Sequence, residues 1–244
     1  MSYTIIDVCH TIHHSMITYQ GLPPPVISDH LSREDSRKFY QDGTEFQIGK
    51  IEMVANTGTY LDSPFHRYAE GKDLAALDLR SLANLDGLVV RCWMGGLSGE
   101  AEAEGTSAQA ITPDAFQHLD LRGKALLFHT GWDTHWRTEK YWSGKHPFLT
   151  ATAAEFLAKA GVALVGIDSY NIDDTADGRR PAHSILLAHG IPIVEHLCGL
   201  NELPDSGFQF FAVPVKVKGL GSFPVRAFAI VAEGGSTGLE RFVE

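Results

Sequence analysis

The stretch NTGTYLDSPFH at residues 56–66 places a carboxylate and an imidazole close together in a restrained backbone. Gly58 allows a conformation or a close approach that a side chain would block, and Pro64 fixes one backbone angle. Asp62 and His66 can therefore be held in fixed orientations, which a metal ligand requires. The same spacing also describes a hydrogen-bonded turn or a surface pair, so it does not decide the chemistry alone.

A second pair of ligand-type side chains, His183 and Glu195, lies downstream. His183 falls in the first turn of a helix predicted to begin near Pro181, where the helix dipole disfavours imidazolium and favours the neutral, metal-binding ring. Glu195 ends the apolar run IPIVE, and a carboxylate on a buried strand is costly unless it is paired or coordinated. The alternatives are a helix-start histidine in solvent and a strand-end carboxylate facing water. The four side chains together predict one divalent-metal site.

Several other side chains could complete such a site. Trp132, Trp136, Tyr141 and Trp142 lie close to His135 in the sequence, and they could line a flat pocket, pack in the core or form a subunit interface.

Three further segments have both a functional and an ordinary interpretation. The loop at 19–24 could reach the site or be a simple turn. Arg179 and Arg180 could neutralise a substrate carboxylate or be solvated, and we assign them no role. Asp168 and Asp173, at a predicted strand end, could orient the ligands.

Other chemistries have little support. The chain contains no GxSxG nucleophile elbow and neither glycine-rich nucleotide motif. Cys9, Cys92 and Cys198 form no CxxC pair, which argues against a disulfide framework or a thiolate zinc site. A Ser/His/Asp triad and a Cys9 thiol nucleophile remain the competing hydrolytic mechanisms, because triads are geometric rather than sequential.

The elements that must position these residues follow a mixed pattern. A helix is predicted over 152–160, with Thr152 and Glu155 at capping-box spacing and Gly161 as its stop; others are predicted to begin at Thr112–Pro113 and to run from Pro181 to Gly190. Strands are predicted from apolar, β-rich runs at Ile5–Val8, Phe46–Val54, Leu88–Trp93, Ala125–Phe128, Val162–Ile167, Ile191–Val194, Phe208–Val217 and Val225–Val231. Residues 97–107, small, acidic and glycine-containing, are predicted to form an exposed loop. This order predicts a single mixed-sheet α/β domain over residues 1–244, unlike a regular Rossmann or TIM series.

Composition excludes several classes of partner. Thirty acidic residues against twenty basic ones give a net charge of -10, which repels nucleic-acid phosphates. No apolar run approaches the roughly 20 residues that span a bilayer, and the N-terminus lacks the features of a signal peptide. We therefore expect a cytoplasmic enzyme acting on a small molecule, without nucleic acid or membrane partners.

The sequence resembles the cyclase or kynurenine formamidase-like hydrolase family, which also includes isatin hydrolase and whose signature runs HTGTHxDxPxH. Residues 56–66 match that signature, and the resemblance covers nearly the whole chain in the expected order. The further matches are DVCHTI followed by YQGLP, HTGWDTHW, VGIDSYNID, PAHSILLAHGIPIVEHL and FPVRAFAIV. The resemblance implies the swivelling β/β/α fold of kynurenine formamidase and a homo-oligomer.

The resemblance also implies a ligand set. In two-metal members, the first two histidines and the aspartate of the signature hold one ion. Here Asn56 and Tyr60 stand at the two histidine positions, so that set is broken. The second set is complete as Asp62, His66, His183 and Glu195. We therefore expect one divalent ion, zinc or manganese, between which ligand type does not choose.

The implied reaction is attack of activated water on the carbonyl of a small amide, lactam, ester or lactone. If only three of the four side chains coordinate, the remaining one, His66 or Glu195, is the candidate general base. Tyr60 is a further catalytic candidate that contributes a phenolate or, more in keeping with its ordinary pKa of about 10, the hydrogen bond of a neutral phenol. A catalytically inactive small-molecule binding protein and a metal-free hydrolase using His66 and His183 are the alternatives. The substrate and the oligomer size are not determined by the sequence.

Overall fold

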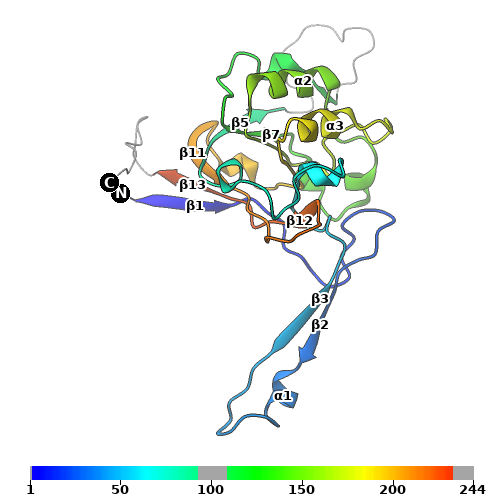
Figure 1. Ribbon diagram of the computed structural model, residues 1–244, viewed down its shortest axis with the longest axis vertical. Helices are drawn as coiled ribbons and strands as arrows, with labels where there is room; N and C mark the ends of the chain where they lie inside the picture. Colours follow the sequence, from blue (N-terminus) through cyan, green and yellow to red (C-terminus); the bar gives the residue numbers. More distant parts are fainter. Residues whose placement is uncertain (1, 93–108, 233–244) are drawn as a thin grey trace.

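The computed structural model describes residues 2–92 and 109–232, and one large mixed β-sheet runs through it (Figure 1). The predicted loop at 97–107 lies outside the described residues. The helices are α1 (Arg33–Ser36), α2 (Ala151–Ala160) and α3 (Pro181–Ala188), with short 3-10 turns between strands. The strands are β1 (Tyr3–Asp7), β2 (Val26–Leu31), β3 (Ile48–Glu52), β4 (Tyr60–Asp62), β5 (Leu85–Arg91), β6 (Ala110–Ile111), β7 (Ala125–His129), β8 (Phe148–Leu149), β9 (Leu164–Ile167), β10 (Ile193–Glu195), β11 (Ser206–Phe211), β12 (Ser222–Pro224) and β13 (Phe228–Ala232).

The nine-stranded sheet has the order β1-β13-β11-β5-β7-β9-β10-β4-β12. Its centre, β5-β7-β9-β10, is parallel, whereas the strands on both sides pair antiparallel. Parallel strands direct their carboxyl ends to one edge, where ligand sites form in open α/β sheets. Glu195 ends β10, and β4 runs antiparallel beside it, so the predicted ligands gather at that edge.

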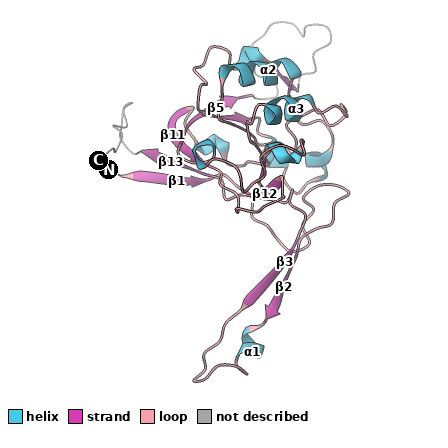
Figure 2. Cartoon of the chain, viewed as in Figure 1, coloured by secondary structure: helices cyan, strands magenta, loops and turns pink. Residues whose placement is uncertain are grey.

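Both faces of the central strands are buried, which explains their nearly continuous apolar sequences. On β7, Phe128 faces the core formed with α2 and α3, whereas its neighbour Leu127 faces the core on the opposite side of the sheet. The two helices lie together over the first of these faces (Figure 2). The strands that carry the site are thereby fixed from both sides.

The predicted helix over 152–160 is present, but its start differs from the prediction. Helix α2 begins after Thr150, whose side chain accepts a hydrogen bond from the Ala153 N–H at 3.2 Å. Thr152 is inside the helix, so its capping-box assignment was wrong. Gly161 ends the helix in the left-handed region at φ 75°, as predicted. Helix α3 begins at Pro181 as predicted.

One other prediction was wrong. Thr112 and Pro113 begin only the 3-10 turn Pro113–Ala115, because the Thr112 side chain makes no capping hydrogen bond and the turn is not continued. The predicted strand Phe46–Val54 is present as the shorter β3, which pairs with β2 outside the main sheet. The other predicted strands overlap observed ones with shifted ends, and Trp93 lies outside the described residues. The strands β2, β4, β6, β8 and β12 were not predicted.

Residues 26–52, which we call the arm, form the β2–β3 hairpin and α1, and they project away from the body (Figure 1). Almost every residue of β2 and β3 is exposed. Large apolar side chains of the arm that are at least 39% exposed are Val26, Ile27, Phe39, Tyr40, Phe46, Ile48 and Ile51. An isolated two-stranded hairpin is marginally stable in water. Exposed apolar side chains gathered in one place are typical of surfaces that contact another protein.

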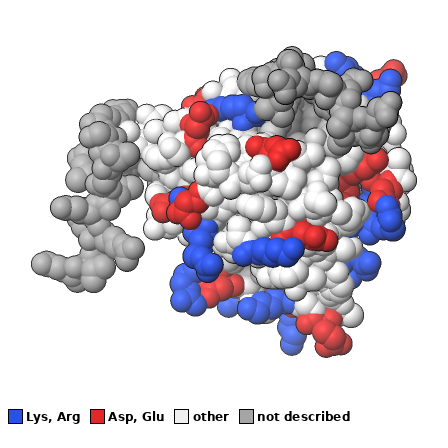
Figure 3. Space-filling model, turned by 90° about the horizontal axis from the view of Figure 1, so that it is seen from above, with Lys and Arg blue, Asp and Glu red and all other residues white. Residues whose placement is uncertain are grey.

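Charges of both signs are interspersed on the face seen in Figure 3. None of the helices in the described part of the chain is long and apolar enough to cross a membrane.

The packing of Phe208 over Gly87 yields a stability prediction. A Cβ atom on Gly87, in β5, would lie 2.0 Å from Cε2 of Phe208 on β11. We expect Gly87→Ala to lower the free energy of unfolding by about 1–3 kcal/mol, because the ring must leave its position. Gly49→Ala in the arm is the matched control, since no atom lies within 4 Å of its Cβ position. Urea denaturation of both variants measures the difference, and equal midpoints would contradict the packing argument.

Candidate metal centre

The register of three neighbouring strands places the candidate site residues opposite one another. On the sheet, Tyr60 of β4 pairs with Glu195 of β10, and Asp62 of β4 pairs with Ser222 of β12. Directly opposed residues point to the same face of a sheet and are close enough for their side chains to interact. Leu61, between Tyr60 and Asp62, points to the opposite face and packs in the core. The alternation of side chains along β4 thus directs the Tyr60 hydroxyl and the Asp62 carboxylate into one site.

Asp62 is fully buried, and one of its oxygens lacks a partner. The Ser222 hydroxyl donates to Oδ1. Oδ2 has no hydrogen-bond partner among the described residues. An unsatisfied buried carboxylate oxygen is costly, so it points to an absent cation.

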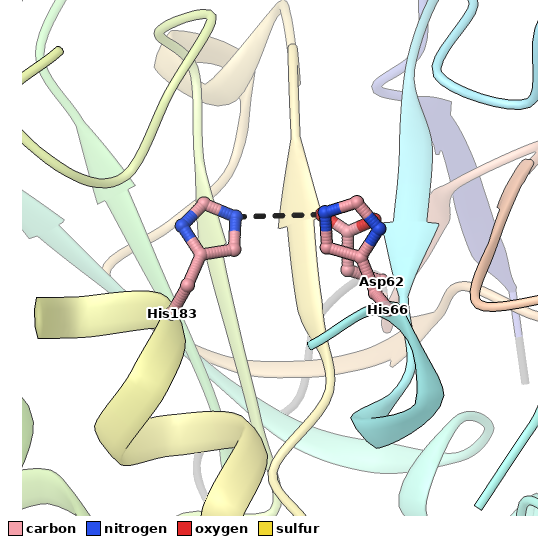
Figure 4. A group of neighbouring side chains, drawn as sticks. All are labelled: Asp62, His66 and His183. Carbon is pink, nitrogen blue, oxygen red and sulfur yellow. Dashed lines mark ion pairs between the residues drawn. The ribbon is translucent and has the colours of Figure 1, made fainter. Parts of the chain in front are cut away.

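His183 faces this oxygen from helix α3 (Figure 4). Its Nε2 lies 3.6 Å from Asp62 Oδ2 and 3.4 Å from Glu195 Oε1. Its Nδ1 lies 2.6 Å from Asp173 Oδ2, which also accepts the His183 backbone N–H. Nδ1 donates its proton to Asp173, so Nε2 is the nitrogen that faces the other two carboxylates, an arrangement typical of metal-ligating histidines.

The charge environment of His183 overturns one sequence interpretation. Burial alone would lower its pKa, but the carboxylates of Glu195, Asp173 and Asp62 outweigh burial and raise it. The helix start therefore does not keep this ring neutral. Without a metal ion the ring holds a proton among the carboxylates, and a divalent cation would replace that proton.

Glu195 is 1% exposed, and both its oxygens accept hydrogen bonds. The Tyr60 hydroxyl donates to Oε2 at 2.5 Å, and the Ile172 N–H donates to Oε1 at 2.7 Å. Burial raises the pKa of Glu195. Burial also raises the pKa of Tyr60 well above its ordinary value, so the phenol is neutral, in agreement with the expectation from its unperturbed chemistry.

His66 is the most accessible of the four residues, with a side chain 37% exposed. Its Nδ1 lies 2.8 Å from the Ser222 hydroxyl, which already donates to Asp62. Nδ1 must therefore carry the proton of the neutral ring, and Nε2 keeps its lone pair. Gly221 permits this placement, because a Cβ atom there would lie 2.5 Å from the His66 Cα.

Asp62, His66 and His183 offer ligand atoms that all lie within 4.8 Å of one another. Glu195 joins them through its 3.4 Å contact with His183. Two carboxylates, two imidazoles and an orphaned buried oxygen suit a divalent cation. The residues present therefore fit a metal ion.

A cavity of about 290 Å³ opens over these residues, and we call it the active-site cavity. Tyr19 and Leu22 line it, so the predicted loop at 19–24 reaches the site. Arg179 and Arg180 line it as well. Asn56, at the first substituted histidine position, lines the cavity and interacts with Tyr60.

The tryptophan cluster does not line the active-site cavity. Trp132 and Tyr141 are buried and pack with Tyr170, and His10 stacks on Trp136 with ring centroids 3.9 Å apart. The described contacts support core packing for Trp132 and Tyr141, and Trp132 and His135 also line a separate cavity of about 560 Å³. Cys9 is also a poor nucleophile, because burial and a hydrogen bond to Asp7 raise the pKa of its thiol to about 12.

Asp168 lies in a separate group with His129 and Asp133. Its carboxylate accepts hydrogen bonds from the Thr130 N–H and the Gly131 N–H, each at 2.8 Å. Arg91 Nη1 lies 2.8 Å from His129 Nδ1; since arginine only donates, the His129 proton is on Nε2. These contacts describe a hydrogen-bonded network. Of the two aspartates considered for orienting the ligands, only Asp173 contacts one.

Comparison with known proteins identifies the family. The family model described as "Putative cyclase" matches residues 6–174. The chain belongs to the cyclase family. A kynurenine formamidase of Bacillus cytotoxicus is 30% identical over 91% of this chain and 95% of its own length, and one of Bacillus cereus is 26% identical over the same shares.

Solved structures of the cyclase family share the fold. Isatin hydrolase A from Labrenzia aggregata superposes with a TM-score of 0.76 at 19% identity, covering 95% of this chain and 94% of its own. A structure described as a potential metal-dependent hydrolase with cyclase activity gives 0.71 at 23% identity, covering 95% and 100%. The predicted single mixed-sheet α/β fold and the recognised family are therefore confirmed. The chain is a hydrolytic enzyme of this family.

Sequence reasoning missed Ser222, which connects Asp62 to His66 in this cyclase-family site. A serine between a glycine and a phenylalanine carries no signal of its own. Only the β4–β12 register brings it opposite Asp62.

This contact generates a prediction about metal affinity. We expect Ser222→Ala to weaken binding of Zn²⁺ by about 10–100-fold, because both the Asp62 oxygen and the His66 tautomer lose their partner. Competition with a chromophoric chelator measures the affinity. Ser63→Ala is the control, because its hydroxyl is buried nearby without a hydrogen-bond partner among the described residues. Unchanged affinity in Ser222→Ala would disprove the role of Ser222.

Proposed function

We propose that this chain is a metal-dependent hydrolase that cleaves the C–N or C–O bond of a small amide, lactam, ester or lactone. The observation that carries the proposal is the buried Asp62 Oδ2, which accepts no hydrogen bond within the described residues and lies 3.6 Å from His183 Nε2. We propose Asp62, His66, His183 and Glu195 as the ligands of one zinc or manganese ion. A divalent ion there supplies Lewis-acid polarisation of the carbonyl and lowers the pKa of water.

The substitution of the two early histidines supports one ion rather than two. Tyr60 is 2% exposed, and its hydroxyl is committed to Glu195. A neutral phenol that donates its proton is a poor ligand, and the Asn56 amide is a weak one. These residues hold Glu195 in place where the two-metal members hold a second ion. Tyr60 then acts through Glu195.

In the arrangement in which only Asp62, His183 and Glu195 coordinate the ion, His66 is free to act as general base, and the geometry favours it over Glu195 in that role. Both Glu195 oxygens accept hydrogen bonds in a buried setting, whereas His66 lines the active-site cavity and keeps a lone pair on Nε2. Nε2 accepts the proton of the attacking water, while Ser222 holds the ring through Nδ1. The charge that develops on His66 is stabilised by Asp62, 3.6 Å from Nδ1. Proton transfer of this kind contributes about 10²–10⁴-fold to rate.

Two relatives support hydrolysis of a C–N bond. One is named for a formamidase activity and one for hydrolysis of isatin, a cyclic amide. The active-site cavity of about 290 Å³ suits a compound of similar size. We propose that the whole chain, residues 1–244, acts as one catalytic domain on such compounds.

Two alternatives make different predictions. An inactive small-molecule binding protein would bind ligand stoichiometrically without turnover under any added metal. A metal-free hydrolase using His66 and His183 would keep its activity after chelation. The second is disfavoured by the 3.4 Å contact of His183 with Glu195, which commits its Nε2 to a carboxylate.

Elemental analysis of the purified protein tests the central proposal. We expect about one equivalent of zinc or manganese per chain in the unmodified protein. The metal should be lost in His183→Ala, because the proposed site needs the neutral imidazole of His183 as a ligand. His189→Ala, at the exposed end of the same helix, is the matched control and keeps its metal. Added metal also raises the melting temperature of the unmodified protein.

The outcomes separate the alternatives. Metal uptake with hydrolysis of formamides, lactams or lactones supports the proposal. No metal in the purified protein and no uptake of zinc or manganese would contradict it, and activity that survives chelation would then favour the metal-free enzyme. Circular dichroism of His183→Ala verifies that metal loss does not follow from unfolding.

We further propose a homo-oligomer in which the arm packs against a second copy of the chain. Ile27 and Ile51 form a cross-strand pair on one face of the hairpin and are 39% and 57% exposed, whereas Val26 and Ile48 expose apolar side chains on the other face. Exposed apolar side chains gathered on one projecting element mark protein–protein contacts. Cys9, Cys92 and Cys198 are free thiols, which suits the reducing cytoplasm that we propose as the compartment.

Light scattering after size exclusion tests the arm. We expect the unmodified protein to elute as an oligomer and the double variant Ile27→Asp, Ile51→Asp to shift to the mass of one chain, because carboxylates would be buried against apolar surface. Leu79→Asp, which is 63% exposed outside the arm, is the control and keeps the oligomer. A monomeric unmodified protein would overturn this proposal.

A further inference from the structure

The mouth of the active-site cavity is basic in a chain of net charge -10. Its lining contains three guanidinium groups, Arg67, Arg179 and Arg180, and a single carboxylate, Glu195, which belongs to the proposed ligand set. Clefts lined by one sign of charge raise the local concentration of oppositely charged ligands. The local charge is therefore opposite to that of the whole chain.

The three arginines differ in how their charge is balanced. Arg179 forms a bidentate pair with Asp177, with Nε–Oδ1 at 2.9 Å and Nη2–Oδ2 at 2.8 Å. Arg67 is exposed; its Nε donates to the Ser184 hydroxyl at 3.3 Å, and its guanidinium carbon lies 5.4 Å from the centre of the Tyr68 ring. Arg180 is half-buried and forms no ion pair with any carboxylate of the described residues. Its guanidinium is thus the least compensated charge beside the site.

The backbone holds Arg180 in a defined position. Its Nη1 donates to the Asp174 carbonyl oxygen at 2.7 Å, which fixes one end of the guanidinium without neutralising it. Its φ of 50° lies in the left-handed region, which a non-glycine residue adopts at a cost and which recurs at ligand-binding positions. The same residue is the N-cap of α3, three positions before His183. The free N–H groups of Arg180 are therefore adjacent to the proposed reacting centre.

We propose that Arg180 binds a carboxylate of the substrate, so that the substrate is an amide or ester that carries an anionic group. This inference rests on the proposed hydrolase function and names the substrate class. A half-buried guanidinium without an anion is costly, and a planar carboxylate matches its remaining donors in a bidentate arrangement. Arg67, an exposed residue of the cavity lining, adds attraction for the approaching anion.

Matched substrates test the proposal. The probes are formanilide, which is neutral, and the ortho, meta and para isomers of formamidobenzoate, which carry a carboxylate at different distances from the formyl group. We expect the unmodified, metal-loaded protein to prefer at least one isomer over formanilide in kcat/KM. Arg180→Gln should lower that preference by about 10-fold or more, because a charge-assisted bidentate contact is lost.

Two variants distinguish charge recognition from a structural role. Arg180→Lys keeps the charge but not the fork, and it should retain part of the preference. Arg179→Gln removes a guanidinium that Asp177 already compensates, and it should retain most of the preference. The ratio of the kcat/KM values for two substrates, measured on one protein preparation, does not depend on the fraction of active protein. An unchanged ratio in Arg180→Gln, or a preference for formanilide in the unmodified protein, would overturn the proposal.

A binding measurement keeps the test decisive if no formamide is hydrolysed. That result would count against the proposed hydrolase function, and calorimetric titration with benzoate and benzamide then tests Arg180 independently. Benzoate binding that is weakened about 10-fold in Arg180→Gln, with benzamide binding weakly to both proteins, supports the anion site. Equal benzoate affinity in the two proteins would overturn it.

Discussion

The burial of two carboxylates beside one imidazole is the constraint around which the active site of this protein is organised. Asp62, Glu195 and His183 are 0%, 1% and 6% exposed. Charges removed from water to this degree require partners in nearly every direction. The chain supplies them from several elements, with Ser222 on Asp62, Tyr60 and the Ile172 N–H on Glu195, and Asp173 on His183. Asp62 Oδ2 accepts no hydrogen bond within the described residues and lies 3.6 Å from His183 Nε2, so a cation bound between them would balance its charge.

The sheet meets this constraint through register. A shift of β4 by one residue would turn Tyr60 and Asp62 into the core and Leu61 into the site, because side chains alternate between the two faces of a strand. Burial of Leu61 against the core therefore maintains the positions of both polar neighbours. The parallel strands on the other side bring Glu195 to the same edge, and α3 lays His183 over it. Stability and site geometry thus depend on the same contacts.

By resemblance to the family signature, Asn56 and Tyr60 stand where two-metal members have histidines, and this difference changes the charge that the site has to balance. The phenol of Tyr60 occupies a Glu195 oxygen by hydrogen bonding, which needs no second cation. A site with one ion has less positive charge to offer an anionic substrate than a site with two. The uncompensated guanidinium of Arg180, three residues before a ligand, supplies positive charge from the protein instead. The proposed recognition of an anionic substrate by Arg180 is consistent with a site in which an arginine, and not a second metal ion, supplies positive charge.

The sequence by itself determined the candidate ligands, the family and the helices α2 and α3, because these depend on local signals. Gly161, Pro181 and the carboxylate at the end of IPIVE act on their own neighbourhoods, and their consequences can be read from spacing. The prediction placed the N-cap of α2 at Thr152 instead of Thr150. Such an error arises because both threonines carry a hydroxyl that can accept the capping hydrogen bond.

Only the tertiary structure decided which residues support those ligands. Ser222 meets Asp62 from 160 positions away in the chain, and the Tyr60 contact with Glu195 spans 135. The charge state of His183 was misjudged from its helix position, because three carboxylates from distant segments outweigh a local dipole. Such pairings depend on strand register and long-range charge, and neither leaves a periodic trace in the sequence.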